Sequence, residues 1–188
     1  FFITCTNHQI LNSNKPLMSI NTFVLINTPF DEKIGWIITE NVYTLLRKDD
    51  SPTYIIKPLS VKDFITKNPQ ISYKKLASTF EAQGYIILKI KEINIPEIED
   101  MYINSRLSSS SVISRESFIR INLAMYDLSE SIIWSDDIIF KDLEHQFYYD
   151  ELNSPLQSLF RTYEEEVQIL INGVSENIVN SLPQHQLK

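Results

Sequence analysis

The sequence predicts an α/β or α+β fold, with a small, mostly parallel sheet in the N-terminal half and a mainly helical C-terminal half. Strand-like apolar runs alternate with helix-like stretches in the first half, which is typical of parallel strands joined by helices. In the second half, apolar residues recur at helical spacing instead. We expect a peripheral extension over 1–17, an α/β sheet region over 18–95 and a helical region over 96–188, packed as one compact domain.

The first elements are a buried strand over 21–27 and a segment over 31–48 that has two interpretations. We favour a helix, because Asp31 and Glu32 suit a helix start. A hairpin is the alternative, since Trp36 and its neighbours favour a strand, and it would make the region an antiparallel α+β sheet. The helix rests on one row of apolar residues at helical spacing: Ile34, Ile38, Val42 and Leu45.

The region that follows is predicted to form a strand over 53–57, two short helices and a third strand over 85–90. Ser60 can cap the first helix, which must stop before Pro69. Ser72 can cap the second helix, whose apolar residues lie on one face. Gly84 is placed as the C′ residue that ends this helix.

The second half predicts helices. One begins at Pro96 and ends near the serine run 108–111, and another carries its apolar residues along 118–128. The segment 132–140 predicts a tight hairpin or a kinked helix around Ser135-Asp136-Asp137. A last helix is expected to begin at Ser154, where a capping box and a proline at the first helical position coincide, and to end at Gly173.

Glycine is scarce, with three residues in a chain of 188, where ordinary usage of about 7% would give roughly 13. This scarcity excludes Gly-rich phosphate loops, dinucleotide fingerprints and nucleophile elbows, which need positive φ or close approach to a ligand. We therefore expect no cofactor. Helix ends account for Gly84 and Gly173, which leaves Gly35 as the one glycine that could serve a ligand site.

The cellular setting is predicted from what the sequence lacks. The single Cys5 excludes an internal disulfide and a cysteine-based zinc cluster. No apolar stretch approaches the roughly 20 residues that span a bilayer. The first residues carry no Lys or Arg ahead of their apolar run, unlike a signal peptide. We expect a cytoplasmic protein without a membrane partner.

Charge is unevenly distributed along the chain. The net charge is −7 and the isoelectric point is near 5.0. Lysines are frequent over 57–91, and acidic residues dominate from Glu92 onward. Acidic surfaces repel nucleic acid and attract basic partners. Lysines and aromatic residues do interleave over 57–91, but we favour core aromatics with surface lysines there and expect no nucleic-acid partner.

A string after the first strand, Pro29-Phe30-Asp31-Glu32, resembles the opening of Toll/interleukin-receptor-like and nucleoside deoxyribosyltransferase-like domains over four residues. The Gly-rich or glutamate-bearing helix of those families has no counterpart further along this chain. We therefore interpret the string as a strand-to-helix turn with Asp31 as the N-cap. Asp31 and Glu32 stay candidates for acid–base groups.

Carboxylates cluster around His145, but their spacing matches no metal signature, and we interpret them as a solvated surface without a metal site. Because the other two histidines lie near the ends of the sequence, His145 is the remaining candidate for a general base.

The composition favours an interaction protein rather than an enzyme. In physical character it is similar to bacterial immunity proteins, antitoxins and phage-encoded inhibitors, which are small, acidic and without cofactor motifs. The predicted function is binding of a basic partner protein. The alternative is an α/β enzyme acting on a nucleotide or phosphodiester through Asp31 and Glu32 or through Asp136 and Asp137. The predicted partner-binding residues are Trp134, Asp136, Asp137, Tyr148, Tyr149, Asp150 and Glu151.

Overall fold

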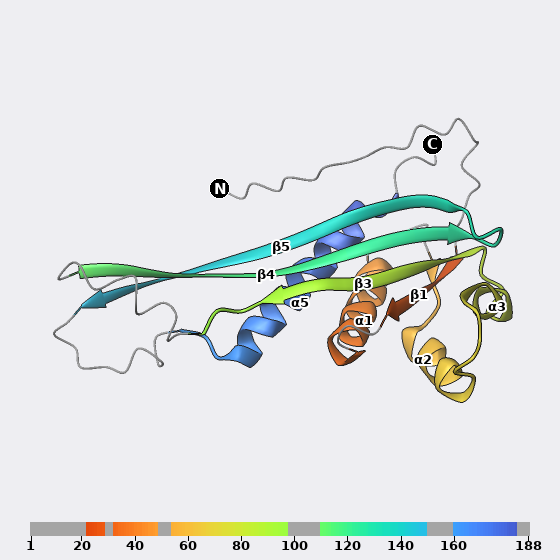
Figure 1. Cartoon of the computed structure of the whole chain (residues 1–188), viewed down its shortest axis with the longest axis horizontal. Coiled ribbons are helices and arrows are strands. Elements are labelled where there is room, and N and C mark those ends of the chain that lie inside the picture. Colours follow the sequence, from red (N-terminus) through yellow and green to blue (C-terminus); the bar gives the residue numbers. More distant parts are fainter. Residues whose placement is uncertain (1–21, 29–31, 49–53, 98–109, 150–159, 184–188) are drawn as a thin grey trace.

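The chain folds around one mixed β-sheet, seen here in a computed structural model that describes residues 22–28, 32–48, 54–97, 110–149 and 160–183. Five strands lie in the order β2-β1-β3-β4-β5, and helices pack on both faces of the sheet (Figure 1). The strands are β1 (Thr22–Thr28), β2 (Tyr54–Ile55), β3 (Gly84–Asn94), β4 (Ser110–Asp127) and β5 (Ile132–Tyr149), and the helices are α1 (Glu32–Lys48), α2 (Pro58–Lys67), α3 (Tyr73–Thr79) and α5 (Tyr163–Ser181).

The first three strands are parallel, as the sequence predicts. β1 pairs in parallel with β2 on one side and with β3 on the other. Helix α1 connects β1 to β2, and α2 and α3 connect β2 to β3. The segment 32–48 is therefore a helix and not a hairpin. The Ser72 cap is also confirmed, because its hydroxyl accepts a hydrogen bond from the Lys75 backbone N–H at 3.3 Å.

The predicted fold class is wrong for the second half, which is not mainly helical. β4 and β5 form an antiparallel hairpin of two 18-residue strands, and β4 pairs with β3 to join the hairpin to the parallel strands. The predicted helix over 118–128 is part of β4. The predicted turn at Ser135-Asp136-Asp137 lies inside β5. The described fold is therefore α+β.

The apolar residues of β4 have the period of a strand. Ile119, Ile121, Leu123 and Met125 are all buried, and Arg120 between them is exposed. Side chains of a strand alternate between its two faces, so this period of two places the four residues on one face. The helical interpretation rested on apolar residues three or four positions apart in the same stretch. It did not consider that apolar and polar residues also alternate there. β-branched residues are also frequent here, which favours a strand.

The turn that closes the hairpin lies at 128–131. The Asp127 carboxylate accepts hydrogen bonds from the backbone N–H groups of Ser129 and Ser131 at 2.8 and 3.0 Å. Glu130 has a φ of 67°, in the left-handed region. This conformation is usual in three-residue hairpin loops, where glycine often supplies it. Because the turn contains no glycine, the positions of the glycines in the sequence did not indicate it.

The ends of the helices also differ from the predictions. α3 ends at Thr79 with Phe80 as its C-cap, and Glu81 takes the left-handed conformation, with a φ of 55°, that we expected at Gly84. Gly84 instead opens β3, where a Cβ atom would collide with the Tyr126 carbonyl oxygen. The last helix begins at Tyr163 and continues past Gly173 to Ser181. Ser154 and the helix expected after Pro96 lie outside the described residues, apart from 96–97, which are not helical.

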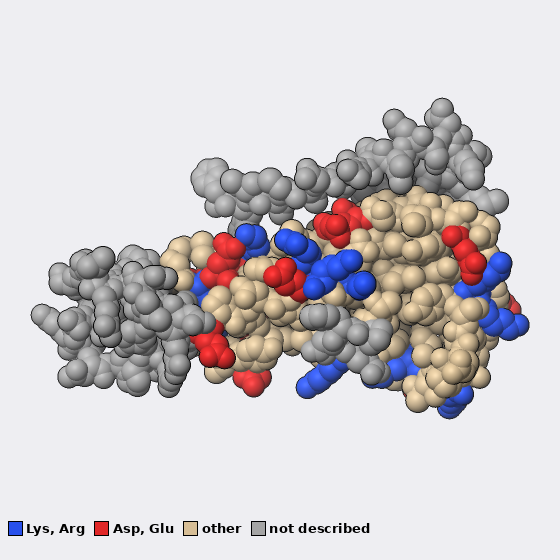
Figure 2. Space-filling model, in the orientation of Figure 1, with Lys and Arg blue, Asp and Glu red and all other residues tan. Residues whose placement is uncertain are grey.

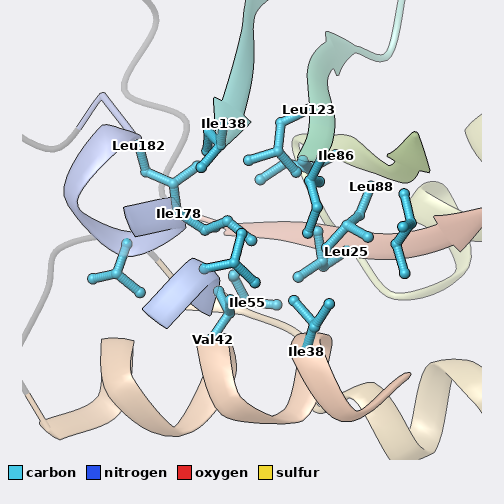
Figure 3. Close-up of a cluster of buried hydrophobic side chains, with 14 of the residues drawn as sticks. Leu25, Ile38, Val42, Ile55, Ile86, Leu88, Leu123, Ile138, Ile178 and Leu182 are labelled. Atoms are coloured by element: carbon cyan, nitrogen blue, oxygen red, sulfur yellow. The ribbon is translucent and has the colours of Figure 1, made fainter. Parts of the chain in front are cut away.

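Two apolar clusters hold the sheet between its helices. The inner face, defined as the face that carries Leu25, Ile86 and Leu123, packs against α1 and α5. Figure 3 shows this cluster, with side chains from the strands meeting Ile38 and Ile178 of the two helices. The opposite, outer face of β1 and β3 packs against α2 and α3. The outer face of β5 is exposed, including Ile139 and Leu143.

Candidate interaction surface at the projecting hairpin

The hairpin extends beyond the rest of the sheet. β3 pairs with β4 only from Phe118 to Asp127, whereas β5 pairs with β4 along its whole length, to Ser110 opposite Tyr149. Residues 110–117 and 142–149 therefore form a two-stranded projecting ribbon (Figure 1, left). A free two-stranded ribbon is marginally stable in water. Something must hold the base of this ribbon in place.

A cluster of five charged residues, two of them buried and three partly exposed, lies at the base of the projecting ribbon. The Arg115 guanidinium contacts carboxylate oxygens of Glu144 and Glu166, both at 2.8 Å. Arg161 contacts Glu144 at 3.3 Å and Glu166 at 3.2 Å, and it also pairs with Asp142. Arg115 is 3% exposed and Glu166 is fully buried. These residues come from β4, β5, the segment before α5 and α5 itself.

Further contacts fix the two arginines of the cluster. Arg115 donates to the backbone carbonyl of Arg161 at 3.2 Å, and its guanidinium lies 5.5 Å from the centre of the Phe160 ring. Burial lowers the pKa of Arg161, but the hydrogen bond that it donates to Asp142 and the charges of Glu166, Asp142 and Glu144 outweigh burial and raise the pKa above its ordinary value. The Arg161 guanidinium therefore stays charged. The cluster combines two arginines with three acidic residues, so acidic groups outnumber basic ones by one.

The start of α5 lies next to this cluster and presents an exposed aromatic ring. Thr162 and Glu165 form a capping box, in which each side chain accepts from the other's backbone N–H. The first helical residue, Tyr163, is 60% exposed, and the following Glu164 is exposed too. The capping box at Thr162 is a sequence signal for this helix start that was missed, because the last helix was expected to begin at Ser154.

The predicted partner-binding residues do not form one surface. Trp134 faces inward and packs against the inner-face cluster, and Asp136 is 7% exposed. Asp137 is exposed and accepts a hydrogen bond from the Asn122 amide at 2.9 Å. Tyr148 and Tyr149 lie in the projecting ribbon opposite Ser111 and Ser110, and Asp150 and Glu151 lie outside the described residues.

The two described acid–base candidates, Glu32 and His145, lie on different elements of the fold. Asp31 lies outside the described residues, and Glu32 is the first residue of α1. His145 is exposed on β5, with its Nδ1 atom 2.7 Å from the Ser114 hydroxyl of β4. This contact joins the two strands of the projecting ribbon. Within the described ranges, no group of three or more His, Cys, Asp or Glu residues could hold a metal ion.

Gly35, the glycine left over for a ligand site, has a packing role. It lies in the first turn of α1 and is buried. A Cβ atom at this position would collide with the side chain of Asn27 at the end of β1. The missing side chain therefore lets the helix approach the strand closely.

Comparison with known proteins finds only distant structural likeness. No family model matches the chain, and no curated protein does. The chain is similar to the lipoprotein GNA1162 from Neisseria meningitidis, with 13% identity over 85% of this chain and 99% of that one and a TM-score of 0.47. It is similar to PelC from Paraburkholderia phytofirmans, solved as a dodecamer, with 11% identity over 85% of this chain and 85% of that one and a TM-score of 0.44. A third similar structure is a minor lipoprotein from Acinetobacter baumannii, with 9% identity over 87% of this chain and 92% of that one and a TM-score of 0.39.

The predicted cytoplasmic location does not agree with these similar structures, two of which are described as lipoproteins. Among the described helices, none has the length and apolar character needed to cross a bilayer.

Proposed function

We propose that this chain is a binding protein that presents its projecting ribbon and the start of α5 to a partner protein with a basic surface. The observation that supports the proposal most directly is the charge cluster at the base of the ribbon. It links both strands of the hairpin to α5 through Arg115, Glu144 and Glu166. The direction of the ribbon relative to the body of the protein is therefore fixed.

A fixed ribbon is more useful for recognition than for stability. Buried ion pairs contribute little net free energy of folding, because the desolvation of each charge offsets the attraction between them. They do impose one geometry. A binding element that is already held in its bound geometry loses less conformational entropy when a partner docks.

The charge of this region favours a basic partner. Thirteen of the 24 acidic residues lie from Ser110 onward, against five of the 17 basic ones. In the view of Figure 2, acidic and basic side chains are interspersed over the described surface, which agrees with exposed pairs such as Lys141 with Glu116. The start of α5 differs, because Glu164 and Glu165 are exposed there beside Tyr163. An exposed tyrosine among acidic residues is typical of a binding hot spot for a basic surface.

The experiment is a quantitative co-purification from the native host with matched variants. Tyr163→Ala and Glu164→Lys are compared with Tyr73→Ala and Asp63→Lys, two exposed positions on α3 and α2. We expect the first pair to lose the partner by about tenfold or more, because hot-spot residues typically contribute about 2 kcal/mol. The control pair should retain it, and the Tm of all four variants should stay close to that of the parent.

Salt dependence gives a second measurement of the same proposal. Binding of a basic partner should weaken as ionic strength rises, because long-range attraction is screened. Retention of the partner by Tyr163→Ala and Glu164→Lys, or binding that does not respond to salt, would contradict the proposal.

A further inference from the structure

β5 is an edge strand along its entire length. β4 pairs with one side of it from Ser110 to Tyr126, and among the described residues no strand pairs with the other side. An open edge of this length presents a row of backbone donors and acceptors that can pair with another strand. Which residues present those groups follows from the hydrogen bonds of the turn.

The backbone groups at the open edge belong to the odd-numbered residues in the middle of β5. At the turn, the Asp127 N–H donates to the Ser131 carbonyl, so the backbone groups of Asp127 face β5. Backbone groups alternate sides along a strand, so Met125, Leu123 and Ile121 also face β5. Their partners in β5 are Trp134, Asp136 and Ile138, which face β4 in return.

Residues 137, 139 and 141 therefore face the open edge. A side-chain contact agrees with this assignment, because the amide of Asn177 on α5 donates to the Ile139 carbonyl at 3.4 Å. A carbonyl oxygen can accept two hydrogen bonds, so the Ile139 carbonyl can still accept one from a second strand.

The side chains of the same three residues lie on the exposed outer face. Ile139 is 39% exposed, the Lys141 side chain is 58% exposed, and Asp137 is exposed. An acid, an apolar residue and a base thus follow one another at every second position. In an antiparallel second copy the order becomes base, apolar residue and acid. Each acid can therefore lie opposite a base, and the two apolar residues can lie opposite each other.

We propose that β5 pairs with β5 of a second copy of this chain, antiparallel, with Ile139 on the twofold axis. The two Ile139 residues then lie opposite each other, and Asp137 of each copy lies opposite Lys141 of the other. Opposite charges directly across an antiparallel pair stabilise it, and apolar neighbours add to this. The pairing goes beyond the proposed function and does not rest on it.

Other registers lack this match. A shift that centres the axis on Lys141 places two lysines opposite each other, and a shift that centres it on Asp137 places two aspartates opposite each other. Between these, Ile139 lies opposite a charged residue. On the inner face, the proposed register brings Asp136 opposite the second copy's Asp142, whose charge is already paired with Arg161. The outer face therefore selects the register.

The first experiment is sedimentation velocity across a concentration series up to about 100 µM, where an interface with a Kd of roughly 10 µM is largely occupied. We expect the parent chain to reach twice the 22.0 kDa mass of one copy. Asp137→Lys alone and Lys141→Asp alone place like charges opposite each other and should each weaken the dimer by about tenfold. The double variant restores opposite charges in reversed order and should dimerise as the parent does.

A cross-link tests the register itself. In a chain with Cys5→Ser, oxidised Ile139→Cys should form a covalent dimer, because paired residues of adjacent strands lie about 5.5 Å apart between Cα atoms, within disulfide range. Ser135→Cys is the matched control on the same face and should form no covalent dimer, because residue 135 of one copy does not lie opposite residue 135 of the other.

Three results would overturn the proposal. A parent chain that stays monomeric at high concentration would show that β5 does not pair with a second copy. Its edge would then be covered by another strand or left open. A double charge variant no better than the single variants contradicts the Asp137–Lys141 pairing. Equal cross-linking at residues 135 and 139 contradicts the register.

Discussion

The two ends of the sheet are stabilised in different ways. Around β1 the sheet is sandwiched, with Leu25 buried against α1 on the inner face and Val24 buried against α2 and α3 on the outer face. Around β5 only the inner face is covered, and charged residues replace apolar ones toward the base of the projecting ribbon. We call the first region the sandwiched unit (residues 22–97) and the second the hairpin (residues 110–149).

The two regions differ in how much of their surface is available to partners. The sandwiched unit uses both faces of its strands for its own core, so little of them is left to bind anything else. The hairpin leaves one face and one edge open, and Ile139 and Leu143 are exposed there. Folding and recognition are thus divided between the two ends of one sheet.

The largest expected effect tests the core of the sandwiched unit. Leu88, on β3, is fully buried between the sheet and its helices. Leu88→Ala should lower the free energy of unfolding by about 4 kcal/mol, through lost transfer energy and a residual cavity. Leu59→Ala, at an exposed position of α2, should cost less than about 1 kcal/mol. Denaturant unfolding measures both, and similar losses would show that Leu88 is not in a tightly packed core.

The charge cluster of the hairpin gives the next effect. Arg115→Met leaves buried Glu144 and Glu166 with less compensation and should cost about 3 kcal/mol. Arg120→Met removes a half-exposed pair with Glu92 at 3.9 Å and should cost at most about 0.5 kcal/mol. A small loss for Arg115→Met in urea unfolding would mean that the cluster does not hold the ribbon.

The boundary between the two regions should respond to alkaline pH. Tyr85 of β3 stacks on Tyr126 of β4, with ring centres 5.0 Å apart. Burial raises the pKa of Tyr85 above its usual 10.0, and the charge of Glu130 raises it further. The neutral phenol is therefore favoured in the folded state, so its contribution to stability is complete below the unfolded pKa and is lost as pH rises through the folded pKa.

The measurement is the free energy of unfolding on either side of that pH. We expect the parent chain to lose more stability above pH 10 than Tyr85→Phe, which has no proton to lose. Parallel curves for the two proteins would contradict the raised pKa.

The smallest expected effect on stability lies in the projecting ribbon. Tyr148→Ala and Tyr149→Ala should change the free energy of unfolding by no more than about 0.5 kcal/mol, because we predict these rings to bind a partner rather than to pack in the core. The same variants should weaken binding of the partner. A lower Tm for either variant would instead assign that ring to the core.

Sequence patterns predicted the sandwiched unit because each of its elements carries a local signal. Ser72 caps a helix at the expected place, and Ile34, Ile38 and Val42 have the spacing of α1. The helices also lie next to the strands they follow, so local pattern and fold agree.

The hairpin was missed because some of its local sequence patterns indicate a structure other than a continuous strand. Asp136 and Asp137 look like a turn, yet Asp136 is 7% exposed inside a continuous strand. Its neighbour Trp134 was predicted as a binding residue and instead packs against the core. The charge cluster was not predictable either, because Arg115 and Glu166 are 51 residues apart and meet only in the folded chain.

The position of α5 along the chain has a consequence for synthesis on the ribosome. Leu170, Ile171, Val174 and Ile178 complete the inner-face cluster, but they follow all five strands in sequence. A nascent chain that has already emerged through β5 still lacks the helix that covers the inner face of its hairpin. Exposed apolar strands are prone to aggregation and are common targets of chaperones. The inner face is therefore expected to need protection until the last helix leaves the exit tunnel.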